Sequence, residues 1–264
     1  MFKQTTNAKN KRNPLKDRPL RYPAQSLDEE IKRLQMEVLT YAVYFAVSLG
    51  LAFVEWSRWY GNLQPQPIPT TIAAAVFVSY SYFKIRQLKK RIRNTKLGRD
   101  GEREVGQSLE ELRQKGYAIF HDIVGGDFNI DHVVVSRRGI FAVETKTKSK
   151  PKNGRVTFDG KSITLTGEKP DDKPIQQAIA VADWLRDSIQ ASTGKRFPVT
   201  PVVVFPGWYV EETSADEKIW VLNPYGLAIK IPQKSQTLTQ EDVHLIAFHL
   251  SRLIKMSYPK EEVY

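Results

Sequence analysis

The stretch FNIDHVVVSRRGIFAVETKTK, residues 128–148, decides the fold class. Its two apolar runs, on either side of Arg-Arg-Gly, predict a β-hairpin whose apolar side chains enter a core. The loop is expected to have three residues, with Gly139 in the left-handed conformation. In that geometry Ser136 pairs with Ile140, and this pairing sets the register of the whole hairpin.

Three charged side chains interrupt these apolar strands. Asp131 lies in the first strand, and Glu144 and Lys146 lie in the second, where alternation points both to one face. The expected register places Asp131 opposite Thr145, within one residue of both. Burying such groups without partners costs several kcal/mol, so they should be ion-paired or bind a metal. Two carboxylates without His or Cys favour Mg²⁺ or Mn²⁺.

This set of side chains predicts a particular chemistry. A metal held by Asp131 and Glu144 can polarise a phosphodiester and activate a water, while Lys146 offsets charge on the developing pentavalent phosphate. The alternative is a solvent-exposed Glu–Lys pair on an edge strand, which would contribute little to stability. Spacing alone leaves both interpretations open, because the triplet Glu-x-Lys is common.

The rest of the chain from Gly98 onward has the pattern of an α/β fold. Helix, strands, helix and strand follow one another, which implies a mixed sheet covered by helices. His121, in a predicted strand, is interpreted as a structural residue. His132 should point to the face opposite to Asp131, so a packing or surface role is expected for it rather than ligation. The further expected elements are helices at 101–116, 174–192 and 239–256 and strands at 117–124, 155–160, 162–167, 201–207, 219–223 and 226–231.

Two apolar segments, about residues 38–55 and 66–83, precede this α/β part. Each approaches the length needed to cross a hydrocarbon core of about 30 Å. Between them, Trp56, Trp59 and Tyr60 are aromatic residues of the kind favoured at a membrane interface. We interpret the pair as a two-helix transmembrane hairpin; the alternative is a pair of helices buried in a protein core.

Basic residues are concentrated before and after these segments. Residues 1–99 hold 18 Lys and Arg against 6 Asp and Glu, whereas residues 100–264 hold 22 against 23. The positive-inside rule then places both termini and the α/β domain in the cytoplasm, with the protein in the cell membrane. Residues 84–99 are expected to contact anionic lipids, at about 1 kcal/mol per basic residue. The net charge of +11 therefore needs no nucleic acid to explain it.

The expected organisation has three parts. Residues 1–25 are predicted to form a disordered basic arm, residues 26–95 the membrane hairpin with its basic juxtamembrane segment, and residues 96–264 the α/β domain. Ser26 and Glu29 match a capping box, which predicts that the first helix begins at Ser26. The chain contains no Cys, which excludes disulfides, zinc–thiolate sites and thiol nucleophiles.

The motifs DGE, NIDHVVVSRRGIFAVETK, PIQQ and PVVVF occur in this order over roughly residues 96–212. In this order and spacing they resemble the nuclease-related domain (NERD) family, within the PD-(D/E)xK, or restriction-endonuclease-like, superfamily of nucleases. The resemblance implies a restriction-endonuclease-like α/β fold, with a mixed sheet flanked by helices. It also implies DNA or RNA as the substrate.

The resemblance further implies roles for individual residues. Asp131 and Glu144 correspond to metal ligands and Lys146 to the catalytic lysine. Glu102 corresponds to a supporting acidic residue on the first helix, and Gln177 to the glutamine of the motif Asn-Pro-x-x-Gln. Here that motif reads KPIQQ, so Lys173 replaces the Asn, a departure that concerns the local loop but not the Gln.

Three functions are compatible with these features. The first is a membrane-anchored, Mg²⁺-dependent nuclease facing the cytoplasm. The second is a catalytically silent module that binds nucleic acid at the membrane, and the third is a membrane protein whose α/β domain is a scaffold for other proteins. Presence of the full set of acidic residues and Lys146 favours the first, whereas the near-neutral charge of the domain favours weak or partner-assisted substrate binding.

Overall fold

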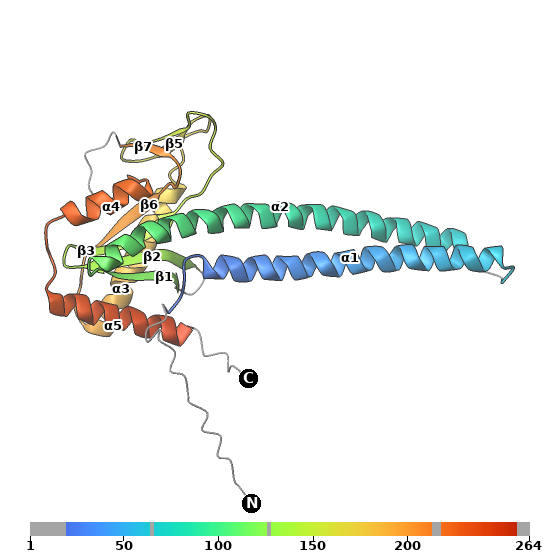
Figure 1. Ribbon diagram of the computed structural model, residues 1–264, viewed down its shortest axis with the longest axis horizontal. Coiled ribbons are helices and arrows are strands. Elements are labelled where there is room, and N and C mark those ends of the chain that lie inside the picture. The colour runs from blue at the N-terminus through green and yellow to red at the C-terminus, as the bar shows by residue number, and fades with distance from the viewer. Residues whose placement is uncertain (1–19, 64–65, 126–127, 213–217, 258–264) are drawn as a thin grey trace, which may run out of the picture.

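The computed structural model describes residues 20–63, 66–125, 128–212 and 218–257. A long helical hairpin projects from an α/β domain (Figure 1). The hairpin consists of α1 (Gln25–Tyr60) and α2 (Pro67–Gln114), and the C-terminal part of α2 packs on the domain. The fold class predicted from the sequence, an α/β domain with a mixed sheet and flanking helices after two long apolar helices, is confirmed.

The main sheet has five strands in the order β1-β2-β3-β6-β8. The pairs β1–β2 and β2–β3 are antiparallel, whereas β3–β6 and β6–β8 are parallel. The strand predicted at 201–207 is β6, which lies between β3 and β8. The bounds are β1 Ala118–Val124, β2 Asn129–Ser136, β3 Gly139–Thr145, β6 Val199–Val204 and β8 Trp220–Leu222.

Helices cover both faces of this sheet. On one face, α3 (Lys173–Thr193) and α5 (Gln240–Ser257) bury Leu185 and Ile246 against Val133 of β2. On the other face, α2 packs Val105, Leu109 and Leu112 against Val134 and Phe141. Successive residues of β2 therefore enter opposite layers of the core, as the period of two in a strand requires.

A second, three-stranded sheet adjoins the main one in the order β5-β4-β7. The predicted hairpin at 155–167 is present as β4 (Arg155–Phe158) and β5 (Ile163–Leu165), and β7 (Tyr209–Glu212) extends it in parallel to β4. Phe158 and Ile163 pack with Ile175 of α3, so this sheet is fastened to the helix that carries Gln177.

The prediction of a strand at 226–231 is wrong. This segment belongs to α4 (Pro224–Gln233). The Asn223 side chain accepts a hydrogen bond from the Gly226 backbone N at 2.7 Å and caps the helix, and Pro224 stands in the first turn, where proline is favoured. Leu227 and Ile231, four residues apart, both enter the core on one helical face.

The expected boundary between hairpin and domain at residues 95 and 96 falls inside α2, which is continuous for 48 residues. The helix predicted at 101–116 is the last part of this element and not a separate one. No proline interrupts α2 after Pro69, and the residues from 84 to 97 are mostly strong helix formers. The second apolar segment and the domain therefore share one rigid element.

The start of α1 also differs from expectation. The helix begins at Gln25 after Ala24, and no side chain of the capping residue is bonded. Ser26 instead donates from its backbone N and its hydroxyl to Asp122 of β1, at 2.7 and 2.8 Å. A carboxylate from the sheet thus accepts hydrogen bonds from the first turn of the helix, in place of the predicted capping box.

Asp122 carries a second bond to the N-terminal segment. Its carboxylate accepts from Arg21 at 2.5 Å, and both side chains are only 2% exposed. The φ angle of Asp122 is 51°, a left-handed conformation that Asp tolerates better than most residues. The expected arm at 1–25 is thus partly wrong, because residues 20–24 lie on the domain; residues 1–19 fall outside the described ranges.

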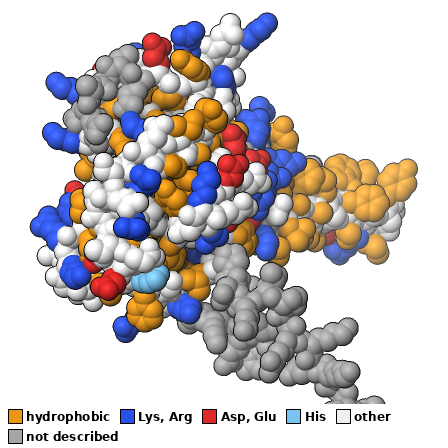
Figure 2. Space-filling model, turned by 60° about the vertical axis from the view of Figure 1, so that its left-hand side comes forward, with side chains coloured by type: hydrophobic (Ala, Val, Ile, Leu, Met, Phe, Trp, Pro, Cys, Tyr) orange, Lys and Arg blue, Asp and Glu red, His pale blue; other side chains and the backbone are white. Residues whose placement is uncertain are grey.

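The apolar segments of the hairpin are exposed. α1 and α2 are both long and apolar enough to cross a membrane; none of the most apolar window of α1, and 11% of that of α2, is buried. Figure 2 shows hydrophobic side chains covering the projecting hairpin. Such exposure argues against the alternative of two buried core helices, since a water-soluble surface rarely carries so large an apolar patch.

The bonds of Asp122 generate a prediction about stability. Replacing Asp122 with Asn keeps the tolerance for positive φ but removes the charge that compensates buried Arg21. Breaking a buried ion pair in this way costs about 3–5 kcal/mol, which chemical unfolding of the full chain in detergent would measure. Asp187→Asn, which breaks an exposed pair with Arg186, is the matched control and should cost much less. Equal losses in both variants would contradict a structural role for the Asp122 pair.

Candidate active site

The register of the β2–β3 hairpin decides which side chains meet. Ser136 pairs with Gly139, so the turn has two residues rather than the expected three, and the strands are shifted by one position. His132 pairs with Val143, and the next step of the same register sets Asp131 against Glu144 rather than Thr145. Directly opposed residues share a face of the sheet. The observed register therefore places both carboxylates on the α3 side.

Glu144, Lys146 and Gln177 form a closed hydrogen-bonded group. The Lys146 Nζ atom donates to Glu144 Oε1 and to Gln177 Oε1, at 2.7 Å each, and the Gln177 Nε2 atom donates to the same Glu144 oxygen at 2.7 Å. Glu144 is buried, whereas Lys146 is partly exposed. Gln177 of α3 thus orients both the carboxylate and the ammonium group, and the ammonium stays accessible from solvent.

Asp131 is held by the neighbouring strand. Its Oδ2 atom accepts a hydrogen bond from the Thr145 backbone N at 2.7 Å. Burial raises the pKa of Asp131 well above its usual range, and the charges of Glu144 and Glu102 raise it further; the bond from Thr145 and the charge of Lys146 oppose this. Burial also raises the pKa of Glu144, against the opposing effect of Lys146.

Glu102 reaches the site from α2. The preceding residue, Gly101, lies so close to the segment after β3 that a Cβ atom there would be 1.9 Å from the Thr147 hydroxyl oxygen. Glycine alone permits this approach, which delivers the next side chain to the carboxylates. Burial, followed by the charges of Asp122 and Glu144, raises the pKa of Glu102 to about 8.

The donor set fits a hard divalent cation. Glu144 Oε2 is buried and has no hydrogen-bond partner among the described residues. Within the same ranges no group of three or more His, Asp or Glu side chains could by itself hold a metal. Mg²⁺ suits such a partial site, because it is typically bound through one or two carboxylates and keeps waters or substrate phosphate oxygens as its other ligands.

All five residues predicted from the sequence therefore belong to one region. Asp131 and Glu144 come from adjacent strands, Lys146 follows β3, Glu102 comes from α2 and Gln177 from α3. Asp122 was not singled out from the sequence, although its charge acts on Glu102. Its place in the apolar run AIFHDIV was the available signal.

The two histidines of the antiparallel strands lie inside the protein, as expected for packing residues. Their Nδ1 atoms are 2.8 Å apart, and His121 Nε2 is 3.0 Å from Glu110 Oε1. Burial lowers the pKa of both rings, most strongly that of His132. Neutral rings suit this contact, since one must donate and the other accept. The pair connects β1 and β2 to Glu110 of α2.

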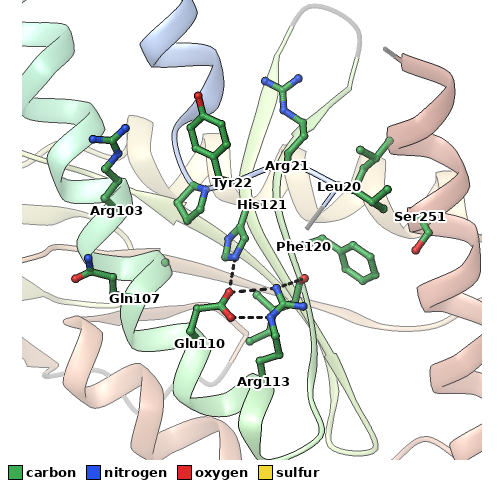
Figure 3. A pocket seen from close by; sticks show the side chains of 14 residues that line it. Leu20, Arg21, Tyr22, Arg103, Gln107, Glu110, Arg113, Phe120, His121 and Ser251 are labelled. Carbon is green, nitrogen blue, oxygen red and sulfur yellow. Dashed lines mark hydrogen bonds and ion pairs between the residues drawn. The ribbon is translucent and has the colours of Figure 1, made fainter. Parts of the chain in front are cut away.

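A cavity of about 640 Å³ lies elsewhere, between the N-terminal segment, α2, β1 and α5 (Figure 3). Its lining includes Tyr22, Arg103, Glu110, Phe120 and His121, and none of the five site residues. The carboxylate site and this cavity are therefore separate features of the domain.

A mixed α/β sheet with two carboxylates and a lysine at adjacent strand ends is the arrangement expected of the nuclease superfamily that the sequence resembles. Residues 97–206 match the family model NERD, described as nuclease-related domain. The chain thus contains a nuclease-related domain, and the matched range includes all five site residues. No curated protein and no solved structure matches the chain.

The raised carboxyl pKa values generate a prediction about metal and stability. The folded site retains protons that the unfolded chain has lost, so this stabilisation is complete below the ordinary pKa of about 4.5 and is lost as pH rises toward 8. In EDTA, the melting temperature of the full chain in detergent should fall between pH 6 and 8, and Mg²⁺ should restore it. Asp131→Asn/Glu144→Gln should abolish the Mg²⁺ effect; a retained effect would place the metal elsewhere.

Proposed function

We propose that the protein is a membrane-anchored, Mg²⁺-dependent nuclease that faces the cytoplasm and hydrolyses phosphodiester bonds of DNA or RNA. The observation that carries this proposal is the bond from Lys146 to buried Glu144, on the same sheet face as Asp131. A purely structural ion pair would not need a second carboxylate of raised pKa beside it. The nuclease-related family match supports the same reaction class.

Each residue has a distinct part in the proposed reaction. Asp131 and Glu144 would hold Mg²⁺, which when bound polarises the phosphodiester and lowers the pKa of a coordinated water. Lys146 neutralises charge on the phosphoryl oxygens as they become more negative. Gln177 keeps Lys146 oriented, because it accepts from the ammonium group and donates to the Glu144 oxygen that the lysine also contacts.

Cleavage by the full chain in nanodiscs tests the proposal. Labelled single- and double-stranded DNA and RNA should be cut in Mg²⁺ and not in EDTA. Glu144→Gln preserves size and should abolish cutting, whereas Lys146→Ala should reduce turnover about 10²–10³-fold with metal binding nearly intact. Gln177→Ala should have a smaller effect, because this residue positions others.

Two results would contradict the proposal in different ways. Cutting that survives in Asp131→Asn/Glu144→Gln would place the reaction at another site. Binding of nucleic acid without any cutting by the wild type would favour the catalytically silent module.

Membrane anchoring rests on the exposed apolar windows of α1 and α2. Basic residues flank both windows, at Lys32 and Arg33 before the first and from Lys84 onward after the second. The positive-inside rule then orients the domain to the cytoplasm.

The basic residues of 84–99 would contact anionic lipid headgroups; among them, Lys89 and Lys90 are exposed. This contact is contradicted if Lys89→Gln/Lys90→Gln/Arg93→Gln keeps the wild-type gain in melting temperature from anionic lipid in nanodiscs.

The absence of native Cys makes the topology directly testable. Asn62→Cys, in the exposed loop between the two helices, should react with an impermeant maleimide added to intact cells. Lys115→Cys, exposed on the domain, should react only after permeabilisation. Labelling of Lys115→Cys in intact cells would overturn the cytoplasmic placement.

A further inference from the structure

A strongly basic segment follows the candidate active site. Residues 146–155 contain Lys146, Lys148, Lys150, Lys152 and Arg155 and no acidic residue, although the domain as a whole is nearly balanced in charge. We call this segment the basic ledge. Its first residue is the proposed catalytic lysine, so the remaining cations extend from the reaction centre itself.

The basic ledge is fixed to the domain along its length. The Lys146 backbone N donates to the Val204 carbonyl at 2.8 Å, and the Trp208 indole N donates to the Lys148 carbonyl at 3.3 Å. At Gly154 a Cβ atom would lie 2.8 Å from the Trp208 ring, so the turn at the end of the ledge packs directly on that side chain. The backbone of the ledge therefore presents its lysines from a defined surface.

Three ammonium groups of the basic ledge are available to a ligand. Lys148 pairs with Glu168 at 3.0 Å, but both side chains are about half exposed, and such pairs contribute little and exchange readily. Among the described residues, the one hydrogen bond of the exposed Lys150 ammonium group goes to the Gly207 carbonyl, at 2.8 Å. Lys152 is exposed and makes no ion pair within the described ranges. An anionic chain that binds these three ammonium groups would therefore break few existing contacts.

The far end of the basic ledge carries an exposed aromatic ring. Arg155 of β4 lies opposite Tyr209 of β7 in the strand register. Its guanidinium group is 5.4 Å from the centre of the Tyr209 ring. The Tyr209 side chain is 58% exposed, which leaves ring surface for another group. A track of cations that ends at an accessible aromatic ring is the combination that binds single-stranded nucleic acid, through phosphates and through base stacking.

We propose that the basic ledge binds the phosphate backbone of a single-stranded nucleic acid and leads it from Lys146 to Tyr209, where a base stacks. A duplex keeps its bases paired inside and cannot offer one to this ring, so single strands bind more tightly. The inference rests on the proposed function in one respect: the bound strand is the substrate of the nuclease. It adds the strandedness of that substrate and the direction in which it leaves the site.

Binding in EDTA, where no cutting is expected, tests the ledge by itself. We would measure the affinity of the full chain in nanodiscs for labelled single-stranded and duplex oligonucleotides at several salt concentrations. Lys148→Gln/Lys150→Gln/Lys152→Gln should lower the slope of log affinity against log salt by about 2, since each phosphate contact to a single strand contributes about 0.7. Between 50 and 200 mM salt, the wild type should then lose about 15–20-fold more affinity than this variant.

The matched control carries the same number of substitutions on α2. Lys89→Gln/Lys90→Gln/Arg93→Gln removes three exposed cations and should leave the salt slope unchanged. Tyr209→Leu should weaken single-strand binding about 5–150-fold and leave duplex binding unchanged, as expected for the loss of one stacked base. Tyr225→Leu, at another exposed tyrosine, should affect neither.

The outcomes separate this inference from the proposed function. If the salt slope is unchanged in the ledge variant, or is lowered in the α2 variant alone, the basic ledge does not bind the phosphate backbone. Equal effects of Tyr209→Leu on single strands and duplexes would overturn the preference for single strands. A wild type that binds single strands through the ledge but never cuts them in Mg²⁺ would support the ledge and contradict the nuclease.

Discussion

The close approach of Gly101 to Thr147 is the contact on which the arrangement of the molecule depends. No Cβ atom fits at this point of α2, so the helix lies directly against the segment that leaves β3. Glu102 follows at once and joins the two carboxylates of the sheet. The same helix contains the second apolar segment, so this one contact relates the direction of the hairpin to the position of the site.

Asp122 secures the other helix of the hairpin in a complementary way. It binds Arg21 and the N-terminus of α1 from the middle of an edge strand. Its charge also raises the pKa of Glu102, so the group that fastens α1 contributes to the electrostatics of the site. Hairpin and domain are thus joined at two places close to the carboxylates.

Sequence patterns predicted the elements better than their connections. Alternating and continuous apolar runs identified β1, β2, β3 and β6, and helical periodicity identified α3 and α5, because these patterns reflect burial directly. The hairpin register depended on the length of the Arg-Arg-Gly turn, where one residue decides which face Asp131 shares. The continuity of α2 and the capping of α1 by Asp122 depend on contacts between distant parts of the chain, which local patterns do not contain.

The same limits apply to the site. Asp131, Glu144 and Lys146 were found because charged residues in apolar strands require partners, and Glu102 and Gln177 because they resemble a family motif. Asp122 matches no motif, and its role is visible only once Arg21 and Ser26 are seen beside it. The α4 segment was misread as a strand because four of its six residues at 226–231 are apolar, a composition that suits either element at this length.

The length of α2 fixes the distance between the membrane and the candidate active site. Glu102 comes 19 positions after Phe83, which ends the second apolar segment, and an α-helix rises about 1.5 Å per residue. In the anchored arrangement that we propose, Glu102 lies about 28 Å along the helix axis from the edge of the bilayer core. An unbroken helix keeps that separation constant, so the protein would act within a thin layer next to the membrane. Nucleic acid elsewhere in the cell would be spared simply by distance.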